Sequence, residues 1–177
     1  MGEGERLSIT ANFCKVCHMN ETESFIFRPA KEKDLEFIIK LSAQVFSKYG
    51  HYEEIVPAWF EQGAVITEVI MEKNDTLGFA MLVLDRQRVI GYRAAHLLAI
   101  GILPEHQRRG VGRALLVHME KVAGKYNAVE INLWTAVDNE PALSFFKKAG
   151  FEIKRFESYY YPKGQGALAM SKWLDST

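Results

Sequence analysis

Residues 98–116 read LAIGILPEHQRRGVGRALL, an apolar run followed by a glycine-rich and arginine-rich loop and then a second apolar pattern. The first run predicts a buried strand, and the spacing of the apolar residues after Gly110 predicts a helix. Free backbone N–H groups and the positive end of the helix dipole meet at such a junction, which suits a phosphate group. Gly110 and Gly112 would let the backbone approach a ligand closely. The loop adds positive charge through Arg108, Arg109 and Arg113.

Three kinds of phosphate loop can be compared with this stretch. A dinucleotide-binding G-x-G-x-x-G loop would need a third glycine where Leu115 stands. A P-loop would need a lysine after its last glycine, and the residue after Gly112 is Arg113. The pyrophosphate loop of acyl-CoA enzymes, Q/R-x-x-G-x-G/A, is matched at each of its fixed positions, by Gln107, Gly110 and Gly112.

The remaining apolar periodicity predicts a single α/β domain over residues 24–177 with a mixed sheet. Strands are predicted at 25–29, 64–72, 77–85, 90–102, 128–134, from 150 onward and 167–173. Helices are predicted at 31–46, 52–62, 110–125 and 139–148, the last with Asp138 or Asn139 as its cap.

A second motif follows the loop along the chain, from Asp138-Asn139-Glu-Pro-Ala142 to Phe145-Phe146-Lys-Lys-Ala-Gly150-Phe151. It resembles N-x-x-A-x-x-x-Y-x-x-x-G-F, the second motif of the GNAT N-acetyltransferase superfamily, and together with the loop it extends the resemblance from about Phe25 to Trp173. The resemblance implies an α/β GNAT fold. Its mixed, mostly antiparallel sheet of about seven strands would splay between strands 4 and 5 and carry about four helices.

The resemblance also implies acetyl-CoA as co-substrate. Backbone groups of the strand before the loop would hold the pantetheine arm, the loop would wrap the pyrophosphate, and Asn139 would contact the cofactor from the other side of the splay. On this basis the cofactor-binding residues are Ile100, Gly101, Ile102, Gln107, Arg108, Arg109, Gly110, Val111, Gly112, Arg113 and Asn139.

The C-terminal segment Tyr159-Tyr160-Tyr161-Pro162, followed by Ala167 and Met170, resembles the ending of protein N-terminal acetyltransferases, nearest to the ribosomal-protein-alanine enzymes. In that subfamily the hairpin tyrosines line the groove for the acceptor peptide. The same aromatic residues could instead simply cover the core. On the first interpretation Tyr159, Tyr161 and Trp134 contact the acceptor.

The sequence departs from that subfamily at its catalytic positions. Trp134 stands where the subfamily has a catalytic glutamate, Phe146 replaces the tyrosine acid, and Gly166 replaces an aspartate. The acceptor therefore stays open among a protein N-terminus, a small amine, an amino acid and a lysine. A non-catalytic CoA-binding regulatory module is the alternative to an enzyme.

His96 is the candidate for the missing general base. In a regular strand it shares one face with Leu98, Ile100 and Ile102, although a bulge near Gly101 would change that parity. Aligned on the loop, histone acetyltransferases of the superfamily carry their general-base glutamate at the position of His96, and an imidazole can accept a proton near neutral pH. Tyr160 is the candidate acid, since the hairpin tyrosines supply the available hydroxyls.

Bulk composition excludes several other functions. The 177 residues carry 22 basic and 22 acidic side chains, so no net charge attracts nucleic acid or a membrane surface. No apolar run approaches the ~20 residues of a membrane span, and no secretory signal is visible, which predicts a cytoplasmic protein. Assembly is open, with a homodimer as one alternative.

The segment Cys14-Lys15-Val16-Cys17-His18 matches the C-x-x-C-H spacing of covalent haem attachment. Such attachment needs export, and no second ligand pair completes a zinc site. We therefore expect neither haem nor metal, and we expect the tail, residues 1–23, to be dispensable. Met19 is a plausible natural start of the chain.

Overall fold

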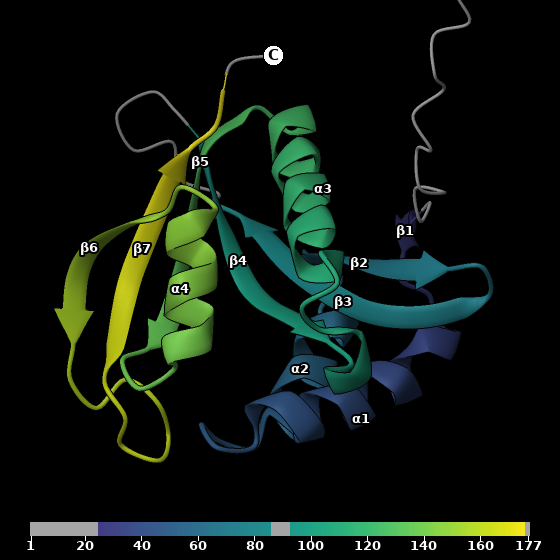
Figure 1. The fold of residues 1–177 in the computed structure, drawn as a ribbon, viewed down its shortest axis with the longest axis horizontal. Coiled ribbons are helices and arrows are strands. Elements are labelled where there is room, and N and C mark those ends of the chain that lie inside the picture. The colour runs from purple at the N-terminus through teal and green to yellow at the C-terminus, as the bar shows by residue number, and fades with distance from the viewer. Residues whose placement is uncertain (1–24, 86–92, 176–177) are drawn as a thin grey trace, which may run out of the picture.

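The computed structural model describes residues 25–85 and 93–175. In these ranges the chain forms one seven-stranded sheet with the order β1-β2-β3-β4-β5-β7-β6. All neighbouring strands are antiparallel except β4 and β5, which run parallel. The predicted mixed, mostly antiparallel sheet is therefore confirmed (Figure 1). The CKVCH segment and the rest of the predicted tail lie outside the described residues.

The N-terminal half supplies four neighbouring strands and two helices: β1 (Phe25–Pro29), α1 (Leu35–Phe46), α2 (Tyr52–Glu61), β2 (Val65–Glu72), β3 (Asp75–Leu84) and β4 (Arg93–Ile102). Asp34 fixes the turn that leads into α1. Its carboxylate accepts hydrogen bonds from both terminal nitrogens of Arg28, at 2.6 and 2.8 Å, and from the Lys31 N–H at 2.7 Å. Because these bonds favour the ionised carboxylate, led by the contact with Arg28, they lower the pKa of Asp34.

The C-terminal half continues with α3 (Val111–Lys125), β5 (Ala128–Ala136), α4 (Glu140–Lys148), β6 (Glu152–Glu157) and β7 (Ala167–Trp173). The chain reverses after α4 through Gly150, whose φ of 93° lies in the left-handed region that glycine tolerates. Predicted and observed elements agree within a few residues at nearly every boundary. None of the helices in the described ranges is long and apolar enough to cross a bilayer.

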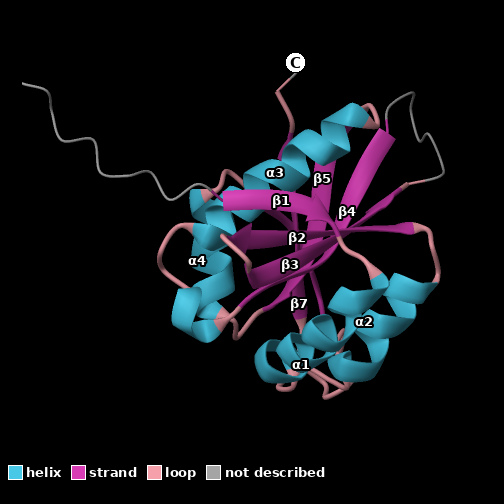
Figure 2. Ribbon diagram, turned by 90° about the vertical axis from the view of Figure 1, so that its right-hand side faces the viewer, coloured by secondary structure: helices cyan, strands magenta, loops and turns pink. Residues whose placement is uncertain are grey.

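Two apolar clusters fill the two sides of the sheet. One cluster packs α3 and α4 against the sheet and includes Leu115, Met119 and Phe146. The other packs α1 and α2 against the opposite side and includes Ile38, Leu41 and Val56. We call these sides the α3–α4 face and the α1–α2 face; Figure 2 shows α3 and the α1–α2 pair on opposite sides of the strands.

The sheet opens between β4 and β5. Their parallel pairing runs from Arg93 and Ala128 to Leu97 and Leu133, and β4 continues beyond it to Ile102 without β5 as a neighbour. Figure 1 shows the two strands together at one end and diverging toward the other. The predicted splay between strands 4 and 5 is therefore present, and it leaves one edge of β4 beyond Leu97 available to a ligand.

A β-bulge in β4 changes which side chains share a face. Ala99 pairs with Met81 and Leu97 with Leu82, so Leu98 has no partner on β3. Leu98 and Ala99 consequently both contact the α1–α2 cluster, although they are consecutive in the strand.

The expectation that His96 shares a face with Ile100 and Ile102 is therefore wrong. Ile100 and Ile102 contact the α3–α4 cluster, as do Ala95 and Leu97 on the other side of the bulge. Side chains alternate along a strand, so His96 points to the α1–α2 face.

Candidate active site

The β4–α3 loop presents free backbone donors at the mouth of the split. Gln107 holds the loop against β4, because its Nε2 donates a hydrogen bond to the Ile102 carbonyl at 3.0 Å. The first helical bond of α3 runs from the Ala114 N–H to the Gly110 carbonyl. Within the described residues, no hydrogen bond uses the N–H groups of Val111, Gly112 and Arg113, and α3 has no side-chain cap. Three donors thus converge where an anion can bind.

The two loop glycines leave room that a ligand can use. Gly110 has φ of 86°, and a Cβ placed on it would meet no atom within 4 Å. A Cβ on Gly112 would point between Ile102 of β4 and Phe145 of α4, at 3.6 and 3.7 Å. The space in front of both glycines therefore faces the opening between β4 and α4, and a longer side chain there would enter it.

The arginines of the loop differ in their partners. Arg109 donates to Glu72 Oε1 at 3.1 Å and lies 2.8 Å from His106 Nδ1, so it ties the loop to the end of β2. No ion pair in the described parts of the chain engages Arg108 or Arg113, and both are exposed. Arg108 has φ of 62°, which helps the loop to turn its N–H groups toward one point.

Gly101 has a packing role that the sequence did not indicate. A Cβ there would meet Phe79 at 3.3 Å, Val45 at 3.4 Å and Leu41 at 3.6 Å. Its missing side chain therefore allows α1 to pack closely against β4.

The residues of the second motif form the start of α4 and its packing against the sheet. Asn139 caps α4, since its Oδ1 accepts from the Ala142 N–H at 3.2 Å; no hydrogen bond among the described residues uses its Nδ2. Phe146 is buried in the α3–α4 cluster, with its ring 5.1 Å from Phe145 and 5.6 Å from Phe151. It therefore serves packing and offers no hydroxyl to the split.

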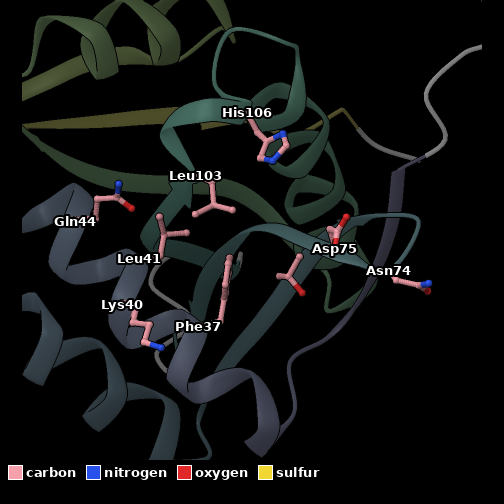
Figure 3. Close-up of a pocket in the computed structure, with 9 residues that line it drawn as sticks. Phe37, Lys40, Leu41, Gln44, Asn74, Asp75, Leu103 and His106 are labelled. Atoms are coloured by element: carbon pink, nitrogen blue, oxygen red, sulfur yellow. The ribbon is translucent and has the colours of Figure 1, made fainter.

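A groove of about 560 Å³ lies on the other side of the loop, between α1 and the β2–β3 turn (Figure 3). It adjoins the loop through Leu103 and His106, and Phe37 and Leu41 form part of its lining. None of the residues predicted to bind the cofactor lines it. The β4–β5 split, unlike the groove, combines an open strand edge with converging N–H groups.

An aromatic cluster occupies the α1–α2 face beside the split. Trp134 is the first residue of β5 beyond the last pair with β4, and Tyr160 stacks on its ring at 4.6 Å. Tyr161 packs against Tyr160, and its hydroxyl lies 3.5 Å from the Trp134 carbonyl. The sequence did not single out two further rings of this cluster, Tyr49 and Tyr52, which contact Tyr161 at 5.2 and 6.4 Å.

Burial keeps the phenols of this cluster protonated. It raises the pKa of Tyr52 to about 12, and it also raises the pKa of Tyr160 and, more strongly, of Tyr161. Tyr160 is 42% exposed, so its hydroxyl can still meet a substrate. Tyr159 is 84% exposed and makes none of the ring contacts found among the described residues, so the structure leaves it outside the cluster.

The β6–β7 hairpin is tied directly to the loop between α1 and α2. Lys163 Nζ donates to the Ser47 carbonyl at 2.8 Å, and Gln165 Nε2 donates to the Lys48 carbonyl at 2.9 Å. Pro162 packs over Gly50. These contacts join the hairpin to the α1–α2 loop beside the aromatic cluster.

His96 lies on the same face as the aromatic cluster. His96 pairs with Asn132 of β5, and directly paired residues point to the same face of a sheet. Trp134 lies two residues after Asn132 in the same strand, so it points to that face as well. The His96 side chain is half-buried, and its Nε2 lies 3.9 Å from Asp85 Oδ2. The candidate base therefore stands beside the split on the aromatic side rather than on the side of the loop.

The comparisons with known proteins agree with this geometry. Residues 35–151 match the model of the Acetyltransferase (GNAT) family. Because that match covers most of the chain, the protein belongs to the GNAT family; it is an N-acetyltransferase, and membership implies acetyl-CoA as its co-substrate. The alternative of a non-catalytic module is set aside.

Relatives and solved structures extend the match over nearly the whole chain. An N-alpha-acetyltransferase of Saccharolobus solfataricus is 26% identical over 167 residues, covering 90% of this chain and 99% of the relative. An N-alpha-acetyltransferase of Sulfurisphaera tokodaii is 28% identical over 159 residues, covering 84% and 93%. The structure of Ard1 from Thermoplasma volcanium superposes with a TM-score of 0.72 at 22% identity, covering 85% of this chain and 97% of that one, so it supports the fold.

Proposed function

We propose that this N-acetyltransferase moves the acetyl group of acetyl-CoA to the α-amine of a protein N-terminus. One observation carries the proposal: the β4–β5 split has the β4–α3 loop with its free N–H groups at its open end, and the aromatic cluster of the α1–α2 face beside the point where the two strands separate. Supporting it, the two archaeal relatives that cover most of the chain are named N-alpha-acetyltransferases.

On the cofactor side, the loop residues would bind acetyl-CoA. The free N–H groups of Val111, Gly112 and Arg113, together with the charges of Arg108 and Arg113, fit a pyrophosphate. The open edge of β4 around Ile100 fits the pantetheine arm. The amide Nδ2 of Asn139 offers a donor on the far side of the split.

On the acceptor side, His96 would accept a proton from the acceptor ammonium, directly or through water, so that the neutral amine can attack the thioester carbonyl. A backbone N–H of β4 near the bulge at Leu98 would stabilise the negative charge that develops on the carbonyl oxygen. Tyr160, kept protonated by its raised pKa, would give its proton to the departing thiolate.

The test uses purified protein, labelled acetyl-CoA and four acceptors. They are a peptide with a free N-terminus, the same peptide with its N-terminus blocked and an internal lysine, a free amino acid, and a small polyamine. Mass spectrometry of the products shows which nitrogen carries the label. We expect label on the α-amine of the free peptide.

Transfer to the lysine of the blocked peptide, or to the small amines with none to the free peptide, would overturn the proposal. Those outcomes would leave membership of the GNAT family unaffected, since the fold and the cofactor loop are independent of the acceptor.

A further inference from the structure

A cation lies against the indole of Trp134, at the point where β4 and β5 begin to separate. Arg155 of β6 pairs with Ala169 of β7, which in turn pairs with Trp134 of β5. The small side chain of Ala169 lets the guanidinium reach across β7, and the Arg155 Cζ lies 4.9 Å from the centre of the Trp134 ring. The charge is therefore held by a cation–π contact next to the aromatic cluster.

This guanidinium has no carboxylate partner among the described residues. Two other cations do have one: Lys154, the preceding residue of β6, binds Glu152 at 2.8 Å, and Lys48 binds Asp138 at 2.8 Å. Glu157, two residues along β6, forms no ion pair with Arg155. A guanidinium that lies against a ring keeps its in-plane N–H donors free, and their fork matches the two oxygens of a carboxylate.

The position fits the path of an acceptor chain. Trp134 borders the split, where the acceptor amine must meet the thioester. Arg155 lies against the Trp134 ring, one residue further from the split. An extended peptide advances about 3.3 Å per residue. The side chains of its second and third residues can therefore reach the guanidinium, which lies 4.9 Å from the Trp134 ring.

From these contacts we propose that Arg155 is a specificity-determining residue, which favours acceptors with a carboxylate in their first three residues. The inference rests on the proposed function, because it assumes a peptide acceptor bound on the α1–α2 face. A purely structural role is the alternative, in which Arg155 only stabilises Trp134 and the edge of the sheet.

Two isomeric peptides separate these roles. One carries two aspartates at positions 2 and 3 and two lysines near its C-terminus, and the other has the aspartates and lysines exchanged. Both share the same first residue and the same net charge, so only the position of the charges differs. The measurement is kcat/KM for each peptide at low and at high salt, with the wild type, Arg155→Gln, Arg155→Glu, Arg155→Lys and Lys154→Gln.

We expect the wild type to prefer the peptide with early aspartates by roughly tenfold at low salt, and less at high salt. Arg155→Gln should bring the ratio close to one, Arg155→Glu should reverse it, and Arg155→Lys should keep its sign. Lys154→Gln is the matched control, since it removes one positive charge from the adjacent position of β6, where Lys154 already binds Glu152. The ratio of kcat/KM for the two peptides should stay close to its wild-type value in Lys154→Gln.

Equal rates for the two peptides in the wild type would overturn the inference alone. So would a preference that persists in Arg155→Gln, or one that Lys154→Gln abolishes as well. Absence of product from both peptides would instead overturn the proposed function, and the inference with it.

Discussion

The two sides of the split differ in the groups they present: one presents mainly backbone N–H groups and the other mainly side chains. The proposed cofactor side is centred on one continuous loop that presents backbone N–H groups and contains two glycines, with the open edge of β4 and Asn139 beside it. The proposed acceptor side consists of side chains from the α1–α2 loop, α2, β4, β5 and the β6–β7 hairpin, which ring contacts and two hydrogen bonds between the hairpin and the α1–α2 loop help to hold together. Binding of a constant ligand can therefore rest on local backbone geometry, whereas the choice of acceptor depends on the packing of distant segments.

The largest expected effect concerns His96, the proposed base on the acceptor side. His96→Ala should lower turnover ~10²–10⁴-fold, because the acceptor ammonium loses its proton acceptor. The acidic limb of the pH–rate profile should disappear, since the base must be neutral to act. Affinity for acetyl-CoA should stay unchanged, which would place His96 on the acceptor side of the comparison. Near-normal turnover with an unchanged profile would assign His96 a structural role.

A smaller effect is expected for the acid. Tyr160→Phe keeps the ring that stacks on Trp134 and removes only the hydroxyl, so turnover should fall about tenfold or more. Because burial raises the pKa of Tyr160 above its ordinary value of 10.0, the acid stays protonated, and its alkaline limb should lie above about pH 10. Rates measured up to that range in both proteins check this. Unchanged turnover in Tyr160→Phe would exclude this hydroxyl.

The bridge between hairpin and helices should affect the acceptor alone. Lys163→Met removes the bond to the Ser47 carbonyl, and we expect the acceptor KM to change roughly three- to tenfold, as for the loss of one hydrogen bond. Steady-state kinetics with each substrate varied in turn measures this. A larger change in the KM of acetyl-CoA than in that of the acceptor would show that the bridge belongs to the cofactor side.

The smallest effect is expected from the N-terminal segment. A protein that starts at Met19 should keep its thermal midpoint, its affinity for acetyl-CoA and its turnover. Metal analysis of the full-length protein provides the control for the CKVCH motif. A stoichiometric metal or haem that disappears together with activity on truncation would contradict the expectation.

The strand–loop–helix junction from β4 to α3 could be predicted from the sequence because its residues are contiguous and their spacing reflects local backbone needs. The seven strands and four helices could also be predicted, because apolar periodicity and the second motif are likewise local features of the sequence. The bulge at Leu98 could not be predicted, since it is a mismatch in pairing between β3 and β4 and leaves no pattern in β4 itself. Because of this bulge, His96 points to the α1–α2 face, whereas a regular strand would place it on the same face as Ile100 and Ile102.

The aromatic cluster of the α1–α2 face was predicted only in part. The tyrosine run at 159–161 drew attention by composition, but the structure leaves Tyr159 exposed and brings in Tyr49 and Tyr52 instead. These two lie far from the hairpin in the chain, and only tertiary packing brings them there. Arg155 gave no signal either, because its contact with Trp134 depends on the register of three strands.

Calorimetric titration of acetyl-CoA into three variants tests the separation of the two sides most directly. Gly112→Glu places a negative charge in the opening between Ile102 and Phe145, Gly112→Ala adds only a methyl group that fits there, and Tyr160→Ala removes a ring from the acceptor side. We predict that Gly112→Glu weakens binding by more than about tenfold through repulsion of the pyrophosphate, while Tyr160→Ala binds within about twofold of the wild type. Normal affinity in Gly112→Glu, or an equal loss in Tyr160→Ala, would contradict this account.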